Sequence, residues 1–194
     1  MKTLLTTLAI TLLAVPAFAV LGLPYAEDAM TQQGEMRITG GITLESDLNL
    51  YGARFSYGIM DGFSVFAGAG LFDPDLGDSE LYLQGGGKYT LPLDLPVDLA
   101  IRASLGYMSG DWFDLMTING GVLASTAVNP MITVYGFGGL SHWRISPDRG
   151  SDNTENELAL AGGAIFNLNE NVSFFAELAH IDEMFISLGA RYTL

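Results

Sequence analysis

The last eight residues of the chain, 187–194, alternate strictly between two kinds of side chain. Leu188, Ala190, Tyr192 and Leu194 are apolar, whereas the residues between them are polar or small. Because successive side chains of a strand point to opposite faces, this pattern predicts a strand with one apolar and one polar face. Beyond the N-terminus, no apolar run reaches the roughly 20 residues of a spanning helix.

This strand resembles the closing strand of bacterial outer-membrane β-barrels. The order of a polar residue, Gly189, and then Tyr192 and Leu194 is also similar to the C-terminal signal that the barrel-assembly machinery recognises, although such barrels usually end in Phe or Trp. The resemblance is to the class of small OmpA-like and OmpX-like barrels, without a specific family. It implies an all-β fold, a closed antiparallel up-and-down transmembrane β-barrel whose apolar face contacts outer-membrane lipid and lipopolysaccharide.

The N-terminus has the pattern of a cleaved secretory signal peptide. Lys2 precedes an apolar run over residues 4–15, and the small-x-small motif at residues 17–19 predicts cleavage after Ala19. A transmembrane anchor is the alternative, but the run is shorter than the roughly 20 residues that a spanning helix needs. We therefore expect a signal peptide at residues 1–19, a periplasmic leader at 20–34 and a single barrel domain at 35–194.

Composition excludes several classes of function. Without Lys2, seven basic residues face 22 acidic ones, a net charge of −15, and such a surface does not bind nucleic acid. The chain has no cysteine, so disulfides and thiolate chemistry are excluded. The glycine pairs are not followed by a predicted helix, so no phosphate-binding loop and no cofactor are expected. The acidic loop at 73–80 lacks EF-hand spacing, which favours a solvated loop over a specific Ca²⁺ site.

Turn residues divide the barrel domain into ten alternating segments, and a count of eight, from merging the first or last pair, is the alternative. With the C-terminus in the periplasm, ten strands put both longer polar connections, 72–79 and 146–155, on the outer side, as expected for this class. The strands are predicted near 35–45, 48–59, 62–72, 79–91, 96–108, 111–125, 131–145, 156–168, 171–181 and 183–194.

The alternation also predicts which charges face the lumen. A cation facing lipid costs about 2–4 kcal/mol near the midplane, and the same phase rule turns nearly all cations of the barrel inward. We expect an ion-paired interior that fills a narrow lumen, or alternatively a charged pore constriction for small polar solutes. The predicted inward residues are the basic Arg37, Arg54, Lys88, Arg102, Arg144 and Arg191 and the acidic Glu45, Glu80, Asp98, Glu157 and Glu177.

Strand 111–125 fits two phases. The favoured phase turns Trp112, Met116, Ile118 and Val122 outward and also turns Asp114 outward, near the external headgroups. The opposite phase would turn Phe113, Leu115 and Asn119 outward.

Aromatic residues are predicted to form two belts at headgroup level, where amphipathic rings are stable. The outer belt comprises Tyr51, Tyr107, Trp112 and Trp143, and the periplasmic belt comprises Tyr57, Phe63, Tyr89 and Tyr192.

Three functions are compatible with these patterns. The leading one is a non-enzymatic barrel, structural or a narrow passive channel for small polar solutes. The second is surface adhesion through the acidic loops 72–79 and 146–155. The third is a rim hydrolase, since some ten-stranded outer-membrane proteases use Asp and His at the outer rim, although their external loops are far longer. Its candidate residues are His180, Asp182, Glu183, Asp111 and Asp114, with His142 expected on the inner wall beside Arg144.

Overall fold

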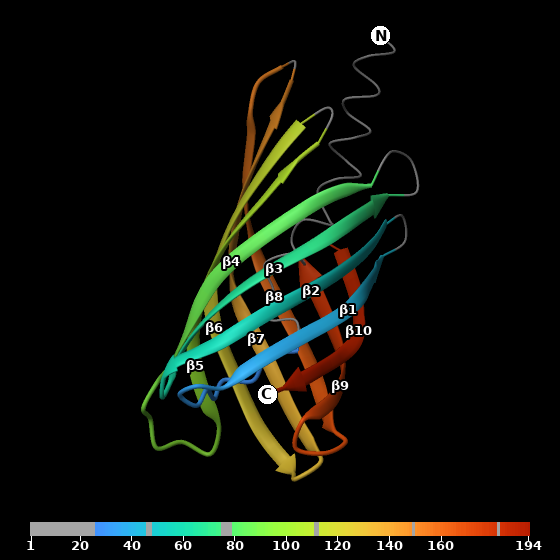
Figure 1. The fold of residues 1–194 in the computed structure, drawn as a ribbon. Coiled ribbons are helices and arrows are strands. Elements are labelled where there is room, and N and C mark those ends of the chain that lie inside the picture. The colour runs from blue at the N-terminus through green and yellow to red at the C-terminus, as the bar shows by residue number, and fades with distance from the viewer. Residues whose placement is uncertain (1–25, 46–47, 75–78, 111–112, 149, 182) are drawn as a thin grey trace.

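The computed structural model describes residues 26–45, 48–74, 79–110, 113–148, 150–181 and 183–194. Within these residues the chain forms ten strands in an antiparallel up-and-down sheet that closes where the first strand pairs with the last (Figure 1). The strands are β1 (Met36–Glu45), β2 (Leu48–Met60), β3 (Phe63–Pro74), β4 (Glu80–Thr90), β5 (Asp98–Ser109), β6 (Phe113–Asn129), β7 (Ile132–Pro147), β8 (Asn153–Asn167), β9 (Val172–Ile181) and β10 (Glu183–Thr193).

The predicted fold class and the count of ten strands are confirmed, and the alternative of eight strands is excluded. The largest boundary difference is at the end of β6, which continues to Asn129 because its pairing with β7 resumes after a register shift next to the turn. No helix in the described part of the chain is long and apolar enough to cross a membrane. The predicted signal peptide, residues 1–19, and the first part of the leader lie outside the described residues.

The strands are steeply inclined to the barrel axis (Figure 1). A row of directly paired residues that starts at Asn167 on β8 returns to β8 at Glu155, so one circuit shifts the register by twelve residues. Ten strands with this stagger correspond to a tilt in the usual range of about 35–45°. The residues of this inclined row are Asn167, Ser173, Arg191, Thr39, Arg54, Gly68, Gln84, Gly106, Thr117, Trp143 and Glu155. Because the strands are inclined, inner side chains from different positions along their strands meet at one level of the lumen.

The outer surface of the barrel is apolar. In β5, Ile101, Leu105 and Tyr107 are exposed, whereas Arg102 and Ser104 between them are buried. This period of two follows from strand geometry and is repeated around the barrel. One exposed apolar residue from each strand in turn is Ile38, Phe55, Val65, Leu83, Ile101, Val122, Val134, Leu160, Phe174 and Leu188.

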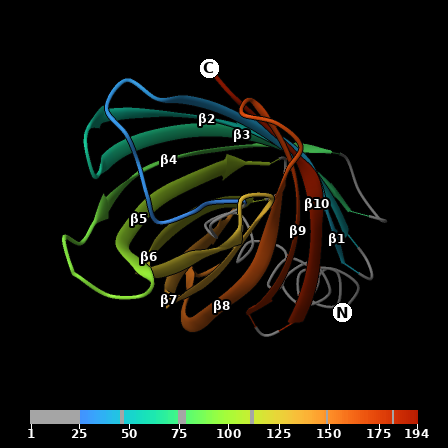
Figure 2. The same ribbon diagram turned by 90° about the horizontal axis from the view of Figure 1, so that it is seen from below.

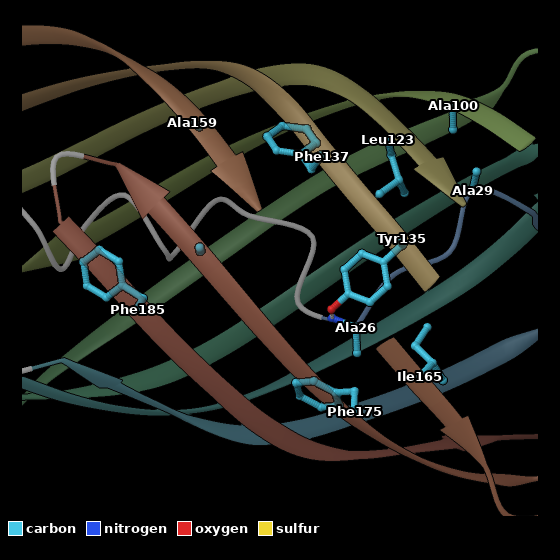
Figure 3. Packing of buried hydrophobic residues seen from close by; sticks show 11 residues of the cluster. Ala26, Ala29, Ala100, Leu123, Tyr135, Phe137, Ala159, Ile165, Phe175 and Phe185 are labelled. Carbon is cyan, nitrogen blue, oxygen red and sulfur yellow. Dashed lines mark hydrogen bonds between the residues drawn. The ribbon is translucent and has the colours of Figure 1, made fainter. Parts of the chain in front are cut away.

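The interior is not purely polar, which differs from the expected polar lumen. We call the end of the barrel with the β2–β3, β4–β5, β6–β7 and β8–β9 connections the turn end, and the opposite end the loop end. Near the turn end, Leu123, Tyr135, Phe137, Ile165 and Phe175 gather in a buried cluster (Figure 3). Near the loop end a second cluster contains Leu50, Phe72, Tyr82, Met108, Leu115, Trp143 and Ile145.

Glycines on the inner wall make room for these inward aromatic rings. A Cβ atom on Gly106 would lie 1.7 Å from Tyr82 Oη on the neighbouring strand, and one on Gly189 would lie 2.5 Å from a ring carbon of Phe175. An aromatic ring that covers a glycine on the adjacent strand is a known way to stabilise a strongly coiled sheet. The same arrangement joins Phe66 to Gly86, Phe137 to Gly121, and Tyr135 to Gly163.

Candidate functional site

The described part of the leader enters the lumen at the turn end, where the chain runs into the ring of strands in Figure 2. Ala26 and Ala29 are almost completely buried, and their amides donate hydrogen bonds to the wall. The Ala26 amide is 3.2 Å from Tyr135 Oη, and the Ala29 amide is 2.8 Å from Ser125 Oγ. Small side chains suit these positions because the surrounding wall leaves little space.

Residues 31–35 of the leader are attached to β2 and to the β2–β3 turn by backbone hydrogen bonds. The Gly62 amide donates to Thr31 O at 3.0 Å, and Gly58 exchanges two bonds of 2.8 Å with Gly34 and Glu35. A Cβ atom on Gly58 would lie only 2.0 Å from Gln32 O, so the leader passes where no larger residue fits. The Thr31 hydroxyl also donates to Ser64 Oγ at 3.3 Å.

Glu27 lies at the centre of a group of wall cations. Its carboxylate is 2.9 Å from Arg102 Nε, 3.3 Å from Arg54 Nη1 and 3.7 Å from Lys88 Nζ, and all four side chains are at most 5% exposed. Phe66 lies beneath both guanidinium groups, with its ring centroid 4.4 Å from Arg102 Cζ and 5.3 Å from Arg54 Cζ. Burial opposes ionisation of Glu27, but the three cations outweigh it and lower its pKa to about 2.

Asp28 binds two further cations of the wall. Its carboxylate is 3.0 Å from Arg37 Nη1 and 2.8 Å from Arg191 Nη1. Burial raises the pKa of Asp28, but Arg37 and Arg191 outweigh this effect and hold the pKa well below its ordinary value. Lys88 Nζ donates to the carbonyls of Asp28 and Met30, which links the two groups of charges.

A small cavity of about 10 Å³ lies between the leader and the wall formed by β1, β2, β3, β4 and β10. This volume is room for about one water molecule. Four of the five cations that face Glu27 and Asp28 contribute to its lining, together with Ala26 and Thr31 of the leader. These cations are Arg37, Arg54, Lys88 and Arg191.

Several residues predicted to face the lumen do lie on the inner wall. Arg54, Lys88, Arg102, Glu177 and Arg191 are buried. Glu177 accepts a 2.7 Å hydrogen bond from Tyr135 Oη, the same hydroxyl that receives the Ala26 amide. Arg37, Glu45, Glu80 and Glu157 are partly buried, and Asp98 is exposed at the turn end of β5.

The charges are arranged differently from the expected pairing of wall cations with wall acids. Glu45, Glu80 and Glu157 lie toward the loop end, whereas the five cations gather toward the turn end and face the leader. Glu177 is the exception, since it lies beside Tyr135 toward the turn end and attracts Arg54 and Arg102. Sequence reasoning missed Glu27 and Asp28. Two sequence features could have indicated them. Inward cations outnumber the acids close to them, and the leader contains an acidic pair between small residues.

The phase of β7 differs from the prediction. Arg144 is on the outer face, with its side chain 54% exposed and paired with Asp152, and His142 lies on the same face, 2.8 Å from Asn156 Oδ1. Trp143, expected in the outer belt, is 1% exposed inside the lumen. The reason is that Tyr135, Phe137 and Trp143 share one face, and the inner glycines accommodate this aromatic face. Register with β6 confirms it, since Trp143 pairs with the buried Thr117.

The other aromatic candidates within the described residues are on the outer face. Tyr51 and Tyr107 are exposed toward the loop end, whereas Tyr57, Tyr89 and Tyr192 are exposed toward the turn end, with Phe63 partly buried there. Trp112 lies outside the described residues. Of the terminal residues, Gly189 is partly buried beneath Phe175, and Tyr192 and Leu194 are exposed.

Strand β6 has the favoured phase. Met116, Ile118 and Val122 are exposed, Leu115 and Asn119 are buried, and Asp114 is exposed and accepts a hydrogen bond from Tyr107 Oη at 3.2 Å.

The predicted rim site is not brought together by the described residues. His180 is exposed on the outer face of β9, opposite Met184 of β10 and Leu160 of β8. Asp111 and Asp182 lie outside the described residues, as do residues 75–78 of the acidic loop, and of Glu183 only the backbone is described. Within the described part of the chain, no group of three or more His, Asp or Glu side chains could hold a metal ion.

Together, the fold and the site define a closed ten-stranded barrel with an apolar outer surface and a lumen that holds the protein's own N-terminal leader. No family model and no curated protein matches the chain.

Among solved structures the chain is similar to outer-membrane barrels, with no specific family indicated. The match to the N-terminal β-barrel domain of Pseudomonas aeruginosa OprF spans 84% of this chain and 100% of the OprF chain, with 13% identity and a TM-score of 0.47. The match to the KdgM porin spans 80% of this chain and 98% of the porin, with 9% identity and a TM-score of 0.48. The match to Ail, the attachment invasion locus protein of Yersinia pestis, spans 84% of this chain and 100% of the Ail chain, with 16% identity and a TM-score of 0.41.

Proposed function

We propose that this protein is a non-enzymatic integral barrel of a bacterial outer membrane whose lumen is closed at rest by its leader. The exposed apolar surface on every strand supports a lipid-facing exterior, since a soluble barrel would bury these side chains. The exposed Tyr residues toward both ends suit the two headgroup regions. His180 has apolar neighbours on the outer face, which supports a non-enzymatic role.

The observation that carries the proposal is the match between the leader and the wall. Two leader carboxylates are buried against five cations that come from β1, β2, β4, β5 and β10. A buried cation without a counter-charge is strongly destabilising, so the wall stabilises a leader that remains in place. The hydrophobic cluster near the loop end narrows the other half of the lumen. A structural barrel, or a channel that conducts only after the leader moves, is therefore favoured over a permanently open channel.

Leader docking can be tested directly because the chain has no cysteine of its own. The hydroxyls of Thr31 and Ser64 are 3.3 Å apart, so the pair T31C/S64C is placed to form a disulfide. We expect this pair to oxidise rapidly in the folded barrel. The control pair T31C/S187C should not, because the Ser187 hydroxyl contacts Thr43 at the β1–β10 seam. Equal cross-linking of both pairs would show that the leader is not held at the turn end.

Closure is tested by recording single-channel conductance of the full chain in planar bilayers, after unheated gel electrophoresis has confirmed a folded barrel. We expect wild type to show no steady conductance, and fractionation of cell envelopes to place it in the outer membrane. Steady steps that persist after oxidation of T31C/S64C would contradict a lumen closed by the leader.

A further inference from the structure

The five cations of the inner wall form two neighbouring groups. Arg54, Lys88 and Arg102 surround the Glu27 carboxylate, whereas Arg37 and Arg191 bind that of Asp28. The cations are fixed on strands, but both acids belong to a segment outside the barrel wall. The wall therefore presents a preorganised place for two adjacent anionic groups, and guanidinium groups suit carboxylate and phosphate alike.

The leader is held unequally along its length. Residues 31–35 are fixed to β2 and the β2–β3 turn by backbone hydrogen bonds. Residues 26–30 are held by wall side chains instead: Tyr135 and Ser125 accept hydrogen bonds from leader amides, and Lys88 donates to leader carbonyls. Ala26 has a φ of 57°, a left-handed conformation that costs a residue with a Cβ atom free energy. The acidic segment and residues 31–35 are therefore held by different kinds of contact.

The cavity beside the leader borders the same charges. It is lined by Arg37, Arg54, Lys88 and Arg191 of the wall and by the acidic Glu27 and Glu35, with Tyr57 and Gly58 at the turn end of β2. Its volume of about 10 Å³ holds about one water molecule, so a larger solute reaches these cations only after the acidic segment has left its site.

We infer that the five wall cations are a binding site for a compact ligand with two anionic groups, carboxylate or phosphate, and that Glu27 and Asp28 are the built-in occupant of this site. Such a ligand from solution competes with the leader. The inference rests on the proposed closure of the lumen by the leader. It goes further in assigning the wall a ligand class and the leader the role of a competitor.

The test removes the competitor without deleting the leader. The full-length variant E27Q/D28N keeps the size of both side chains and removes the two carboxylates that the site holds, while the pair of Arg37 with Glu35 remains. Inorganic pyrophosphate is titrated into the detergent-solubilised protein, and the melting temperature is followed by circular dichroism. Ligand that binds only the folded state raises this temperature. We expect the apparent Kd of E27Q/D28N for pyrophosphate to be at least tenfold lower than that of wild type, and addition of R102Q to weaken binding again.

The matched control is D148N/D152N, which changes the net charge equally in the exposed β7–β8 loop. This control should bind pyrophosphate as wild type does. Equal binding by E27Q/D28N and D148N/D152N, or no binding by either, would overturn the inference. If the double variant fails to fold, E27Q and D28N are tested singly, and each should bind inorganic phosphate more tightly than wild type.

Titration with succinate, followed by the same melting measurement, distinguishes recognition of phosphate groups from recognition of carboxylates. Stabilisation by pyrophosphate alone assigns phosphate groups to the site, and stabilisation by succinate as well admits carboxylates. Failure of the two proposals can be told apart. Steady conductance of wild type would contradict a closed lumen, whereas identical anion binding by wild type, variant and control would contradict the anion-binding site.

Discussion

Glu27 Oε2 lies 2.9 Å from Arg102 Nε, and both side chains are shielded from solvent in the interior of the barrel. One partner belongs to a segment without regular structure, and the other to the middle of a strand wall. This contact makes the stability of the barrel depend on a leader that precedes it in sequence.

Replacement of Glu27 by Gln should therefore destabilise the barrel. Arg54, Lys88 and Arg102 would lose their shared counter-charge, and removal of one partner from a buried pair costs about 3–5 kcal/mol. The free energy of unfolding in urea, measured in detergent micelles, checks this. The control is Asp152→Asn, which breaks an exposed pair with Arg144 and should leave unfolding unchanged. Equal effects of the two substitutions would count against a stabilising role for the leader.

The same carboxylate predicts an acid dependence. Its pKa falls from the ordinary 4.5 to about 2 in the folded state, so it contributes stability that is fully present above pH 4.5. This contribution is lost as the pH falls from about 4.5 toward 2. We expect the difference in unfolding free energy between wild type and Glu27→Gln to be constant at neutral pH and to shrink across this window. A difference that does not change down to pH 2 would show that folding does not lower the pKa of Glu27.

Gly58 should be required for leader docking. A Cβ atom there would lie 2.0 Å from Gln32 O, a backbone atom that cannot move without displacing the leader. In the T31C/S64C background, Gly58→Ala should slow disulfide formation at least tenfold. Gly40→Ala is the control, because its Cβ atom would meet nothing closer than 3.8 Å. An unchanged rate in Gly58→Ala would mean that the leader reaches Ser64 by another path.

The inward position of Trp143 can be checked by fluorescence. The chain has two tryptophans, so Trp112→Phe leaves Trp143 as the only one. Its emission should be weakly quenched by lipids with brominated acyl chains, since the ring is 1% exposed inside the lumen. The comparison variant W112F/W143F/Y107W carries an indole at an outward position and should be strongly quenched. Strong quenching would contradict the inward position of Trp143 and would place its ring in the outer aromatic belt.

Most of the strand pattern could be predicted from the sequence because lipid and lumen impose opposite requirements on alternate residues. In β5, Ile101 and Leu105 alternate with Arg102 and Ser104 without exception, so the phase is unambiguous. In β7 both faces contain apolar residues, and Tyr135, Phe137 and Trp143 fit either environment. The direction of Tyr135 and Phe137 is decided by Gly121, Gly139 and Gly163, which leave room for these two rings once β6, β7 and β8 have paired.

The position of the leader could not be predicted from periodicity, since residues 26–34 have no repeating pattern. It is determined by charge matching across the lumen, which requires the three-dimensional arrangement of five strands. The alternation predicts Arg54 and Arg102 inside, but it does not predict that their partner Glu27 belongs to the leader. Glu27 and Asp28 belong to a segment that was expected to lie outside the barrel.

The ion pairs of Asp28 have a consequence for the order in which structure forms. This one carboxylate binds Arg37 on the first strand and Arg191 on the last, which is 163 residues away in sequence. Contacts so distant along the chain form late in folding. A barrel whose β10 has not yet joined β1 has only half of the Asp28 site, so secure seating of the leader is coupled to completion of the ring. Arrival of the leader in its site therefore marks a finished barrel.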